Sequence, residues 1–477
     1  MMLVSGYSGI GKSVLVQEVY KPITRQRGYF ISGKFDQFQR NIPYASLIQA
    51  FRSLVLQLLM ENEAEIATWR EKLLVALGSN AQVIIEVIPE VELIVGSQPA
   101  VPELPPTEAK NRFNLVFQNF IKVFTCQEHP LVLFLDDLQW ADGASLKLID
   151  LLMTATDSKY LFLIGAYRDN EVNAAHPLTL TLDEIRKAKV RVNQILLSPL
   201  ALPHIIHLIN DIFHCEPATA ISLAELVLTK TGGNPFFIGE CLKFLYAEAL
   251  VIFNYERSSW QWDLGQLQAQ QITDNVVELM VAKVQKLPPQ TQAVLKLAAC
   301  IGNQFSLERL AIVYEKPLRE TAVHLQVAIS EGFILPLSNA YKLVELDVEG
   351  LSNRVALEYK FAHDRIQQAV YSLISEADKQ LVHLQVGQLL LQNTHPRELE
   401  HKLFDVVNQL NFGRTLINQQ TERNVLVDLN LQAGKKAKAS AAYQSAFNYL
   451  KVGLELLDED CWQTQYALTL KLYSDRK

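Results

Sequence analysis

The feature that most constrains the fold is a glycine-rich segment at residues 6–13, which reads GYSGIGKS. A short apolar stretch with the composition of a β-strand, residues 1–5, comes directly before it, and a helical pattern over residues 12–20 follows. The segment matches GxxxxGK[ST] in full, between the strand and the helix that this motif requires. A strand that turns through glycines into a helix predicts an α/β fold with a phosphate-binding loop.

Each residue type in this loop has a physical role in holding phosphate. Glycines let the backbone curl so that several N–H groups point to one side, and the helix N-terminus adds a partial positive charge. The lysine reaches β- and γ-phosphate oxygens, and the hydroxyl after it ligates Mg²⁺. We therefore expect ATP or ADP and Mg²⁺ as ligands, with Lys12 as a catalytic residue and Ser13 on the metal. The residues expected to contact nucleotide are Gly6, Ser8, Gly9, Ile10, Gly11, Lys12, Ser13 and Val14.

Strand and helix patterns alternate up to about residue 200. Short apolar runs rich in β-branched and aromatic residues predict buried parallel strands at 28–32, 131–135, 160–166 and 190–197. Helical patterns lie between them at 44–60, 111–124 and 144–155. With the first strand, this predicts a parallel five-stranded sheet in an α/β P-loop NTPase domain over residues 1–200.

The stretch 89–107 interrupts this pattern with five prolines, so it cannot be one helix. We expect an exposed excursion between helices. It could be a plain surface loop or a contact for a partner.

Two carboxylates, Asp136 and Asp137, end the strand predicted at 131–135. They lie where α/β sheets bind ligands, at the carboxyl end of a strand. Asp136 would hold Mg²⁺ through water, and Asp137 would orient or deprotonate an attacking water. Such a pair could instead cap a helix, but the phosphate loop upstream favours the catalytic interpretation.

Arg168 follows the next predicted strand in the same way. A cation there could reach a phosphate bound at the carboxyl edge of the sheet, so Arg168 is a candidate catalytic residue. The alternative is a structural salt bridge, for example to Asp169 or Glu171.

Beyond Pro199 the pattern becomes mostly helical. Residues 201–274 predict a helical domain whose helices break at 232–235. Residues 275–375 predict helices followed by a small strand pair, near 333–335 and 358–362, and a helix from Asp364. That order suggests a winged-helix unit.

The region 376–477 is amphipathic helix. Between 429 and 457, small and large residues are spaced as in a tetratricopeptide-type helical hairpin. A stack of such hairpins needs neighbours to bury its apolar faces, so we expect the array to continue.

Composition argues against several classes of function. The chain has 477 residues and a formal net charge of −7, so no basic excess points to nucleic acid or to an anionic membrane. No apolar run reaches the roughly 18–20 residues of a membrane helix. The five cysteines are scattered without zinc spacing, and we expect thiols in a reducing, cytoplasmic setting. The N-terminus lacks the features of a signal peptide and begins within a strand, so we expect a part of a longer protein.

Several motifs together resemble the STAND class of signal-transduction ATPases, which is close to origin-recognition-like AAA proteins. Residues 136–142, DDLQWAD, resemble its second nucleotide motif, and residues 163–169, LIGAYRD, resemble its sensor-1 strand. The resemblance implies that Arg168 reads the γ-phosphate. Residues 233–237, GNPFF, resemble the glycine–x–proline motif of its helical lid, which implies that Pro235 packs against adenine. A simple turn is the other interpretation of that motif.

Residues 361–365, FAHDR, resemble the winged-helix histidine motif of the same class. The resemblance implies that His363 lies against the ADP phosphates and holds a closed resting state. Two other interpretations stay open, a hydrogen-bonded structural histidine and a histidine-kinase phosphoacceptor. The proline usual downstream of a phosphoacceptor and the glycine-rich ATP-lid motifs of those kinases are missing.

The segments GKFDQ at 33–37, RNIPY at 40–44 and NRFN at 111–114 resemble the ATPase segment of large bacterial hybrid kinases. Those proteins place a Ser/Thr kinase domain before this segment and sensor and histidine-kinase domains after it. The chain has no kinase catalytic loop, so we expect a slow, regulatory ATPase whose kinase activity lies in flanking domains. We expect protein partners at the C-terminal helices and the flanking domains, and an ATP-dependent oligomer is possible. Arg186 and Arg191 could serve a neighbour as arginine fingers or be surface charges.

Two other functions remain open. In a DNA-binding regulator the recognition helix would be 317–331, but it carries Glu320 and Glu331 beside Arg319 and is not a phosphate-binding face. The other is a nucleotide-binding scaffold with negligible turnover, whose C-terminal helices bind protein.

Overall fold

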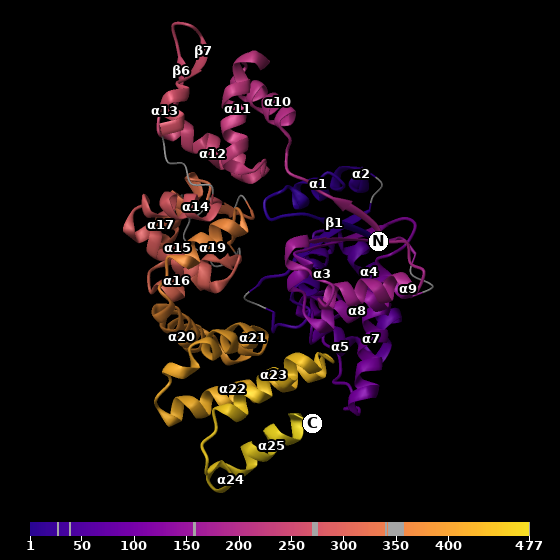
Figure 1. Ribbon diagram of the computed structural model, residues 1–477. Coiled ribbons are helices and arrows are strands. Elements are labelled where there is room, and N and C mark those ends of the chain that lie inside the picture. Colours follow the sequence, from indigo (N-terminus) through magenta and orange to yellow (C-terminus); the bar gives the residue numbers. More distant parts are fainter. Residues whose placement is uncertain are drawn as a thin grey trace. The chain divides into compact units, whose positions relative to one another are not determined.

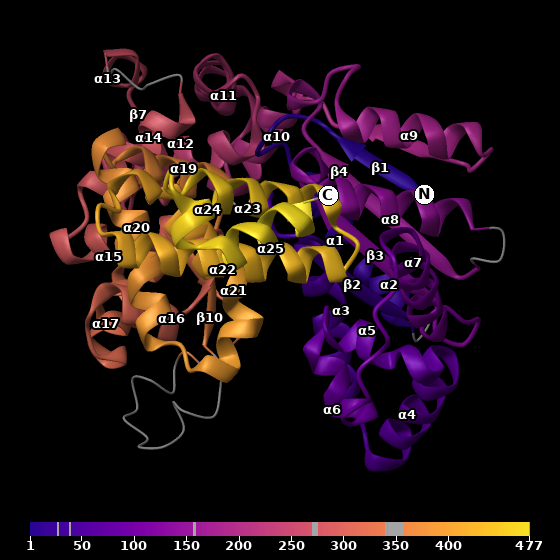
Figure 2. The same ribbon diagram turned by 90° about the horizontal axis from the view of Figure 1, so that it is seen from below.

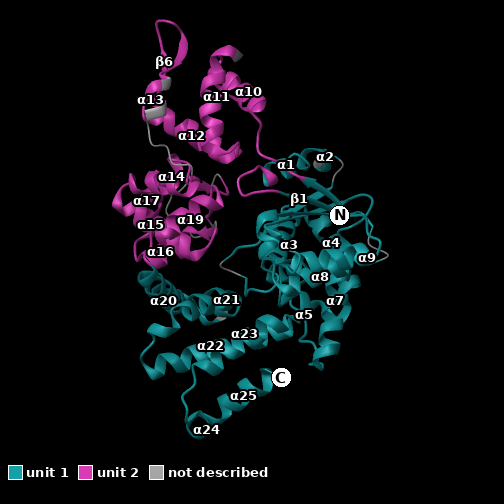
Figure 3. Ribbon diagram, in the orientation of Figure 1, with its two compact units in different colours: residues 1–5, 13–195, 376–477 teal, residues 6–12, 196–375 magenta. Residues whose placement is uncertain are grey.

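The structure, a computed structural model, describes residues 1–25, 28–37, 40–155, 159–269, 275–338, 341 and 357–476 (Figure 1). The chain divides into two compact units. The first contains residues 1–5, 13–195 and 376–477, and the second contains residues 6–12 and 196–375. These ranges are drawn in two colours in Figure 3.

The first unit is built on a five-stranded sheet with the strand order β2-β3-β4-β1-β5. The ladders β2–β3, β3–β4 and β4–β1 are parallel, which confirms the predicted sheet. All side chains of β3 are buried, as expected for a parallel strand covered on both faces. The strands are β1 Met2–Ser5, β2 Tyr29–Lys34, β3 Leu131–Asp136, β4 Leu161–Tyr167 and β5 Asn193–Leu196.

The helices around this sheet pack through a cluster of aromatic side chains. Phe113, Phe117 and Phe120 recur at helical spacing along α7 and are fully buried, together with its C-cap residue Phe124 and with Phe51 of α3. The rings of Phe51 and Phe120 lie 5.4 Å apart in an edge-to-face arrangement, which fixes α3 against α7. The N-terminal helices of the unit are α1 Lys12–Gln17, α2 Tyr20–Arg25, α3 Ala45–Leu58, α4 Glu63–Leu77, α5 Ala81–Ile85, α6 Glu92–Val95, α7 Pro106–Val123, α8 Gly143–Thr154 and α9 Pro177–Lys187.

The C-terminal helices belong to the same unit. Helices α22, α23 and α25 lie side by side (Figure 2), and the absence of a side chain at Gly434 lets α22 approach Leu450 of α23 closely. Ala437 and Ala446 of this pair join the core that contains Tyr44, whose hydroxyl donates to Ser440 O at 3.0 Å. These helices are α20 Glu376–Asn393, α21 Pro396–Phe412, α22 Gln420–Ala439, α23 Tyr443–Glu455, α24 Cys461–Thr464 and α25 Tyr466–Arg476.

Two predicted features of the first unit differ from the structure. The strand predicted as buried at 190–197 is the shorter β5, which lies at one edge of the sheet and has all its side chains exposed. The proline-rich stretch 89–107 begins with a helical turn and α6, which bury Val91 and Ile94. Only residues 96–105 lack regular structure before α7 begins at Pro106.

The second unit is mostly helical, as predicted. Its helices are α10 Leu202–Phe213, α11 Pro217–Thr231, α12 Pro235–Ala247, α13 Leu264–Ala269, α14 Val276–Gln285, α15 Pro289–Ile301, α16 Leu307–Tyr314, α17 Leu318–Ser330 and α19 Asp364–Ser372. A small antiparallel sheet has the order β8-β10-β9, with β8 Gln304–Ser306, β9 Ile334–Pro336 and β10 Glu358–Phe361. The predicted strand pair is present, and β8 is an additional strand.

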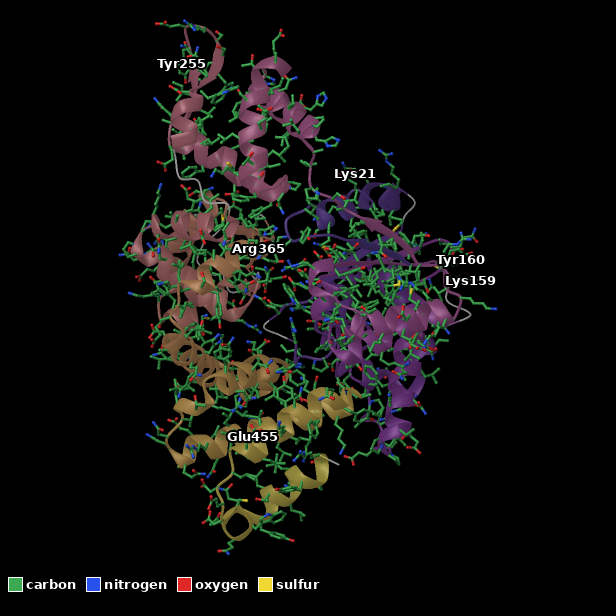
Figure 4. All side chains as sticks on the ribbon, viewed as in Figure 1. Lys21, Lys159, Tyr160, Tyr255, Arg365 and Glu455 are labelled. Atoms are coloured by element: carbon green, nitrogen blue, oxygen red, sulfur yellow. The ribbon has the colours of Figure 1, made fainter. Side chains whose placement is uncertain are left out.

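A β-hairpin interrupts the predicted helices of residues 201–274. Its strands are β6 Val251–Asn254 and β7 Ser259–Trp262, and Tyr255 follows β6 at the turn (Figure 4). The ring of Trp260 packs 5.2 Å from Phe213 of α10, so burial of the aromatic side chains favours the hairpin. In the described part of both units, no helix has the length and apolar character to cross a membrane.

Candidate functional site

The phosphate-binding loop predicted from the sequence begins directly after β1 and ends where α1 starts at Lys12. Gly6, Gly9 and Gly11 have φ values of 146°, 81° and 101°, a range that other residues rarely adopt. The glycines therefore allow the tight turn between strand and helix. A Cβ atom at Gly6 would lie 2.7 Å from Leu197 O, so the close approach of backbone also requires glycine there.

Lys12 is buried and turns back over the loop. Its Nζ donates to Gly6 O at 2.8 Å and to Tyr7 O at 2.9 Å, and the Ile10 N–H closes a turn to Tyr7 O at 3.3 Å. The ammonium group is thus held inside the loop by its backbone carbonyls. Val14, two residues further along α1, is 67% exposed, as an apolar contact for a ligand would be.

The N-terminus of α12 contacts the same loop within the second unit. Asn234 Nδ2 donates to Ser8 O at 2.8 Å, and the Phe236 N–H donates to Gly9 O at 3.2 Å. Asn234 also caps α12, because its Oδ1 accepts from the Phe237 N–H at 3.2 Å. Pro235 is the first residue of this helix, a position that suits its missing N–H.

His363 is the N-cap of α19, and its Nδ1 accepts from the Arg365 N–H at 3.1 Å. Its ring lies flat on Phe236, with centroids 3.8 Å apart and planes 13° apart. Figure 4 labels Arg365 at the start of the helix that His363 caps. These contacts support a structural role for His363, while its contact with ADP stays a prediction.

In the first unit, the side-chain oxygens of Ser13 and Asp136 lie next to each other. Ser13 Oγ donates to Asp136 Oδ2 at 2.6 Å, and the Asp137 N–H donates to Asp136 Oδ1 at 2.9 Å. Asp136 is the last residue of β3 and is buried. A hydroxyl and a carboxylate are hard ligands of the kind that Mg²⁺ prefers, so these residues fit the predicted metal.

Asp137 lies in a left-handed backbone conformation with φ 55°, which turns its carboxylate into a buried polar network. Gln139 Nε2 donates to its Oδ1 at 2.8 Å. Two cations flank the carboxylate, with Lys34 Nζ 3.3 Å from Oδ2 and Arg168 Nε 3.3 Å from Oδ1. The carboxylate that we expect to act on water is therefore ion-paired.

Arg168 is 2% exposed and is held on several sides. Its Nη1 lies 2.8 Å from Glu171 Oε1, and its guanidinium carbon lies 4.4 Å from the centre of the Trp140 ring. Trp140 Nε1 in turn donates to Glu171 Oε2 at 3.1 Å. The predicted alternative, a salt bridge to Glu171, is present, and Asp137 is a further partner.

Four residues of this site have no role predicted from sequence, although each lies in one of the motifs described above: Lys34, Gln139, Asn234 and Phe236. The position of Lys34 just after a predicted strand could have indicated that it lies near the site. It ends β2 as Asp136 ends β3, and the two residues are register partners in adjacent parallel strands. Arg186, a predicted candidate finger, pairs with Asp183 on the exposed face of α9.

Comparisons with known proteins agree with this geometry. Residues 1–164 match the AAA ATPase domain family. The whole chain is 31% identical, over an alignment of 582 residues, to 17% of a protein named hybrid signal transduction histidine kinase G from Dictyostelium discoideum. Over 77% of its length, the chain is also 21% identical to 18% of histidine protein kinase 1 from Candida albicans. The predicted resemblance to AAA ATPases and to a segment of hybrid kinases is confirmed, and the chain spans less than a fifth of these relatives.

Two solved structures are also similar. A STAND protein with a tetratricopeptide repeat sensor from Pyrococcus horikoshii is 13% identical, with a TM-score of 0.47, over 99% of this chain and 55% of that one. Cdc6p from Pyrobaculum aerophilum is 13% identical, with a TM-score of 0.30, over 79% of this chain and 88% of that one.

Proposed function

We propose that this chain is a regulatory ATP-binding and ATP-hydrolysing switch, and that it serves as the ATPase module of a larger multidomain sensor kinase. The observation that carries the proposal is the complete phosphate-binding loop, with Ser13 paired to Asp136 at 2.6 Å. The match of residues 1–164 to AAA ATPase domains supports an ATPase-type P-loop domain. The similarity to hybrid kinases supports the signalling context.

In this proposal the loop N–H groups and Lys12 bind the β- and γ-phosphates. Ser13 and Asp136 would hold Mg²⁺, which neutralises charge on the phosphate oxygens when bound. Asp137 orients the attacking water, and Arg168 reads the γ-phosphate. Asp137 and Arg168 form an ion pair with each other. Because hydrolysis would require this ion pair to rearrange, we expect ATP turnover to be slow.

The remaining regions act on this site as domains of a switch. We assign residues 201–274 as the helical lid, with Pro235 against adenine, and residues 275–375 as a winged-helix-like domain whose His363 senses ADP. Residues 376–477 are a tetratricopeptide-like region that binds protein partners. The five cysteines are free thiols, which supports a reducing, cytoplasmic setting.

The test uses two substitutions in the complete chain. Lys12→Ala removes nucleotide binding, because it deletes the cation of the loop. Asp137→Asn keeps ATP binding but stops hydrolysis, because the amide cannot accept a proton from water. Lys187→Ala, on the exposed face of α9 beside Glu184, is the control and keeps both properties. The two measurements are binding of a fluorescent ATP analogue and release of phosphate. A wild-type rate of phosphate release in Asp137→Asn would refute the catalytic role proposed for Asp137.

A second candidate function, a nucleotide-binding scaffold with negligible turnover, is favoured by one observation. Asp137 is engaged by Lys34, Arg168 and Gln139, as a carboxylate held away from catalysis would be. This function predicts ATP binding with no measurable hydrolysis, even in the full-length protein with its partners. Slow hydrolysis that depends on Asp137 supports the switch instead.

A further inference from the structure

The Ser8 and Gly9 carbonyls of the phosphate-binding loop are both held by the first turn of α12. Asn234 donates to Ser8 O at 2.8 Å, and the Phe236 N–H donates to Gly9 O at 3.2 Å. All these residues belong to the second unit. Two successive peptide groups of the loop are therefore fixed from the same side.

The orientation of a carbonyl determines the orientation of the next N–H. A trans peptide is planar, so its C=O and N–H point in opposite directions. Holding Ser8 O and Gly9 O turns the N–H groups of Gly9 and Ile10 to the other side of the loop. In the structure the Ile10 N–H donates to Tyr7 O within the loop at 3.3 Å. Loop N–H groups that share one direction are what a phosphate requires.

The fit between α12 and the loop depends on the lack of a side chain at Gly9. A Cβ atom there would lie 2.8 Å from Asn234 Oδ1 and 3.0 Å from Phe236 Cβ. Phe236 is itself supported by the ring of His363, which stacks on it at 3.8 Å. The contact is thus closely packed, with a hydrogen bond at each of the two carbonyls.

We infer that Asn234 is a positioning residue, which orients the loop N–H groups for the β-phosphate of a nucleoside diphosphate or triphosphate. Phe236 assists it through its backbone N–H, and the ring of His363 supports Phe236. This inference rests on the proposed function, since it concerns the same nucleotide. It adds that part of the phosphate affinity comes from α12, outside the glycine-rich motif.

The test separates the two hydrogen bonds of Asn234. Asn234→Ser keeps an oxygen that can cap α12 but cannot reach Ser8 O, so the helix cap remains and the loop contact is lost. Asn234→Asp is the second variant, since it also keeps the cap and replaces the donor with an acceptor. Asn62→Ser is the matched control, because Asn62 caps α4 through the Glu65 N–H at 3.0 Å.

The measurement is the ratio of the Kd for adenosine to the Kd for ADP, which isolates the contribution of the phosphates. One lost hydrogen bond lowers this ratio about three- to tenfold in Asn234→Ser, while adenosine affinity is unchanged. Asn62→Ser keeps the wild-type ratio. A wild-type ratio in both Asn234 variants, or an equal fall in Asn62→Ser, would overturn the inference alone. A wild-type chain that binds no ADP would overturn the proposed function and the inference together.

Discussion

Arg168 pairs with the buried carboxylate of Asp137 and the more exposed carboxylate of Glu171, and its replacement provides the sharpest test of how this site is held. Its side chain is 3% exposed and that of Asp137 is 5% exposed, so both charges are out of water. Arg168→Met keeps most of the apolar length of the side chain and removes the charge. The substitution leaves Asp137 and Glu171 without their guanidinium partner.

The size of the effect follows from burial. Removal of one partner of a buried ion pair costs about 3–5 kcal/mol, because the other charge stays buried without compensation. Lys34 Nζ remains 3.3 Å from Asp137, which places the expected loss near the lower end, about 3 kcal/mol. For a domain of this size, 1 kcal/mol changes Tm by about 2–4 °C, so Tm should fall by about 6–12 °C.

Differential scanning calorimetry measures this change, and Arg186→Met is the control. Arg186 pairs with Asp183 at 3.1 Å, but these side chains are 46% and 50% exposed, so the loss should stay below about 1 kcal/mol. The double variant Arg168→Met/Asp137→Asn should regain part of the stability, because it also removes the carboxylate charge. If Arg168→Met lowers Tm no more than Arg186→Met, the ion pair does not stabilise the site, and the reasoning is refuted.

Two further predictions concern the second unit. His363→Phe keeps an aromatic ring on Phe236, whereas His363→Asn keeps only the cap of α19. ADP affinity should therefore fall less in His363→Phe than in His363→Asn. Equal losses of affinity in an ADP titration would argue against a role for the ring stack. Burial would raise the pKa of Glu240, but hydrogen bonds and charges from Lys243 and Lys283 outweigh it and lower this pKa. The stability from Glu240 is therefore present above the ordinary carboxyl pKa and is lost as pH falls through its lowered value. The fall of Tm in acid should be shallower in Glu240→Gln, and an unchanged slope would contradict this assignment.

The parts of the fold that depend on local pattern could be predicted from the sequence. The glycines at 6, 9 and 11 require positive φ, and the apolar run ending in Asp136 marks a central strand, so sheet and loop followed from residue type alone. The exposure of β5 could not be predicted, because an apolar run has the same composition at the edge of a sheet as at its centre. The β6–β7 hairpin was missed because the partial burial of Trp260 depends on a tertiary contact with Phe213.

The candidate site shows the same division. The phosphate-loop motif and the carboxylates after a strand predicted Ser13 and Asp136 as metal ligands, and the structure places their side chains 2.6 Å apart. The partners of Asp137 could not be predicted with equal ease, since Lys34 is 103 positions away in the chain and reaches it only because β2 and β3 are adjacent. Strand order is a property of the whole sheet, and no local pattern specifies it.

The two halves of the nucleotide machinery are constrained in opposite ways, and this has a functional consequence. The loop carbonyls of Ser8 and Gly9 are fixed by α12, so phosphate binding requires little rearrangement of the backbone there. Asp137, by contrast, is paired with Lys34 and Arg168, so in the proposed mechanism it would have to leave one of them to act on water, and separating buried charges costs free energy. The proposed function therefore predicts that this conformation favours ATP binding over ATP hydrolysis. A nucleotide that binds readily and is cleaved slowly occupies the site for a long time, which is the property that a switch needs and a metabolic enzyme does not.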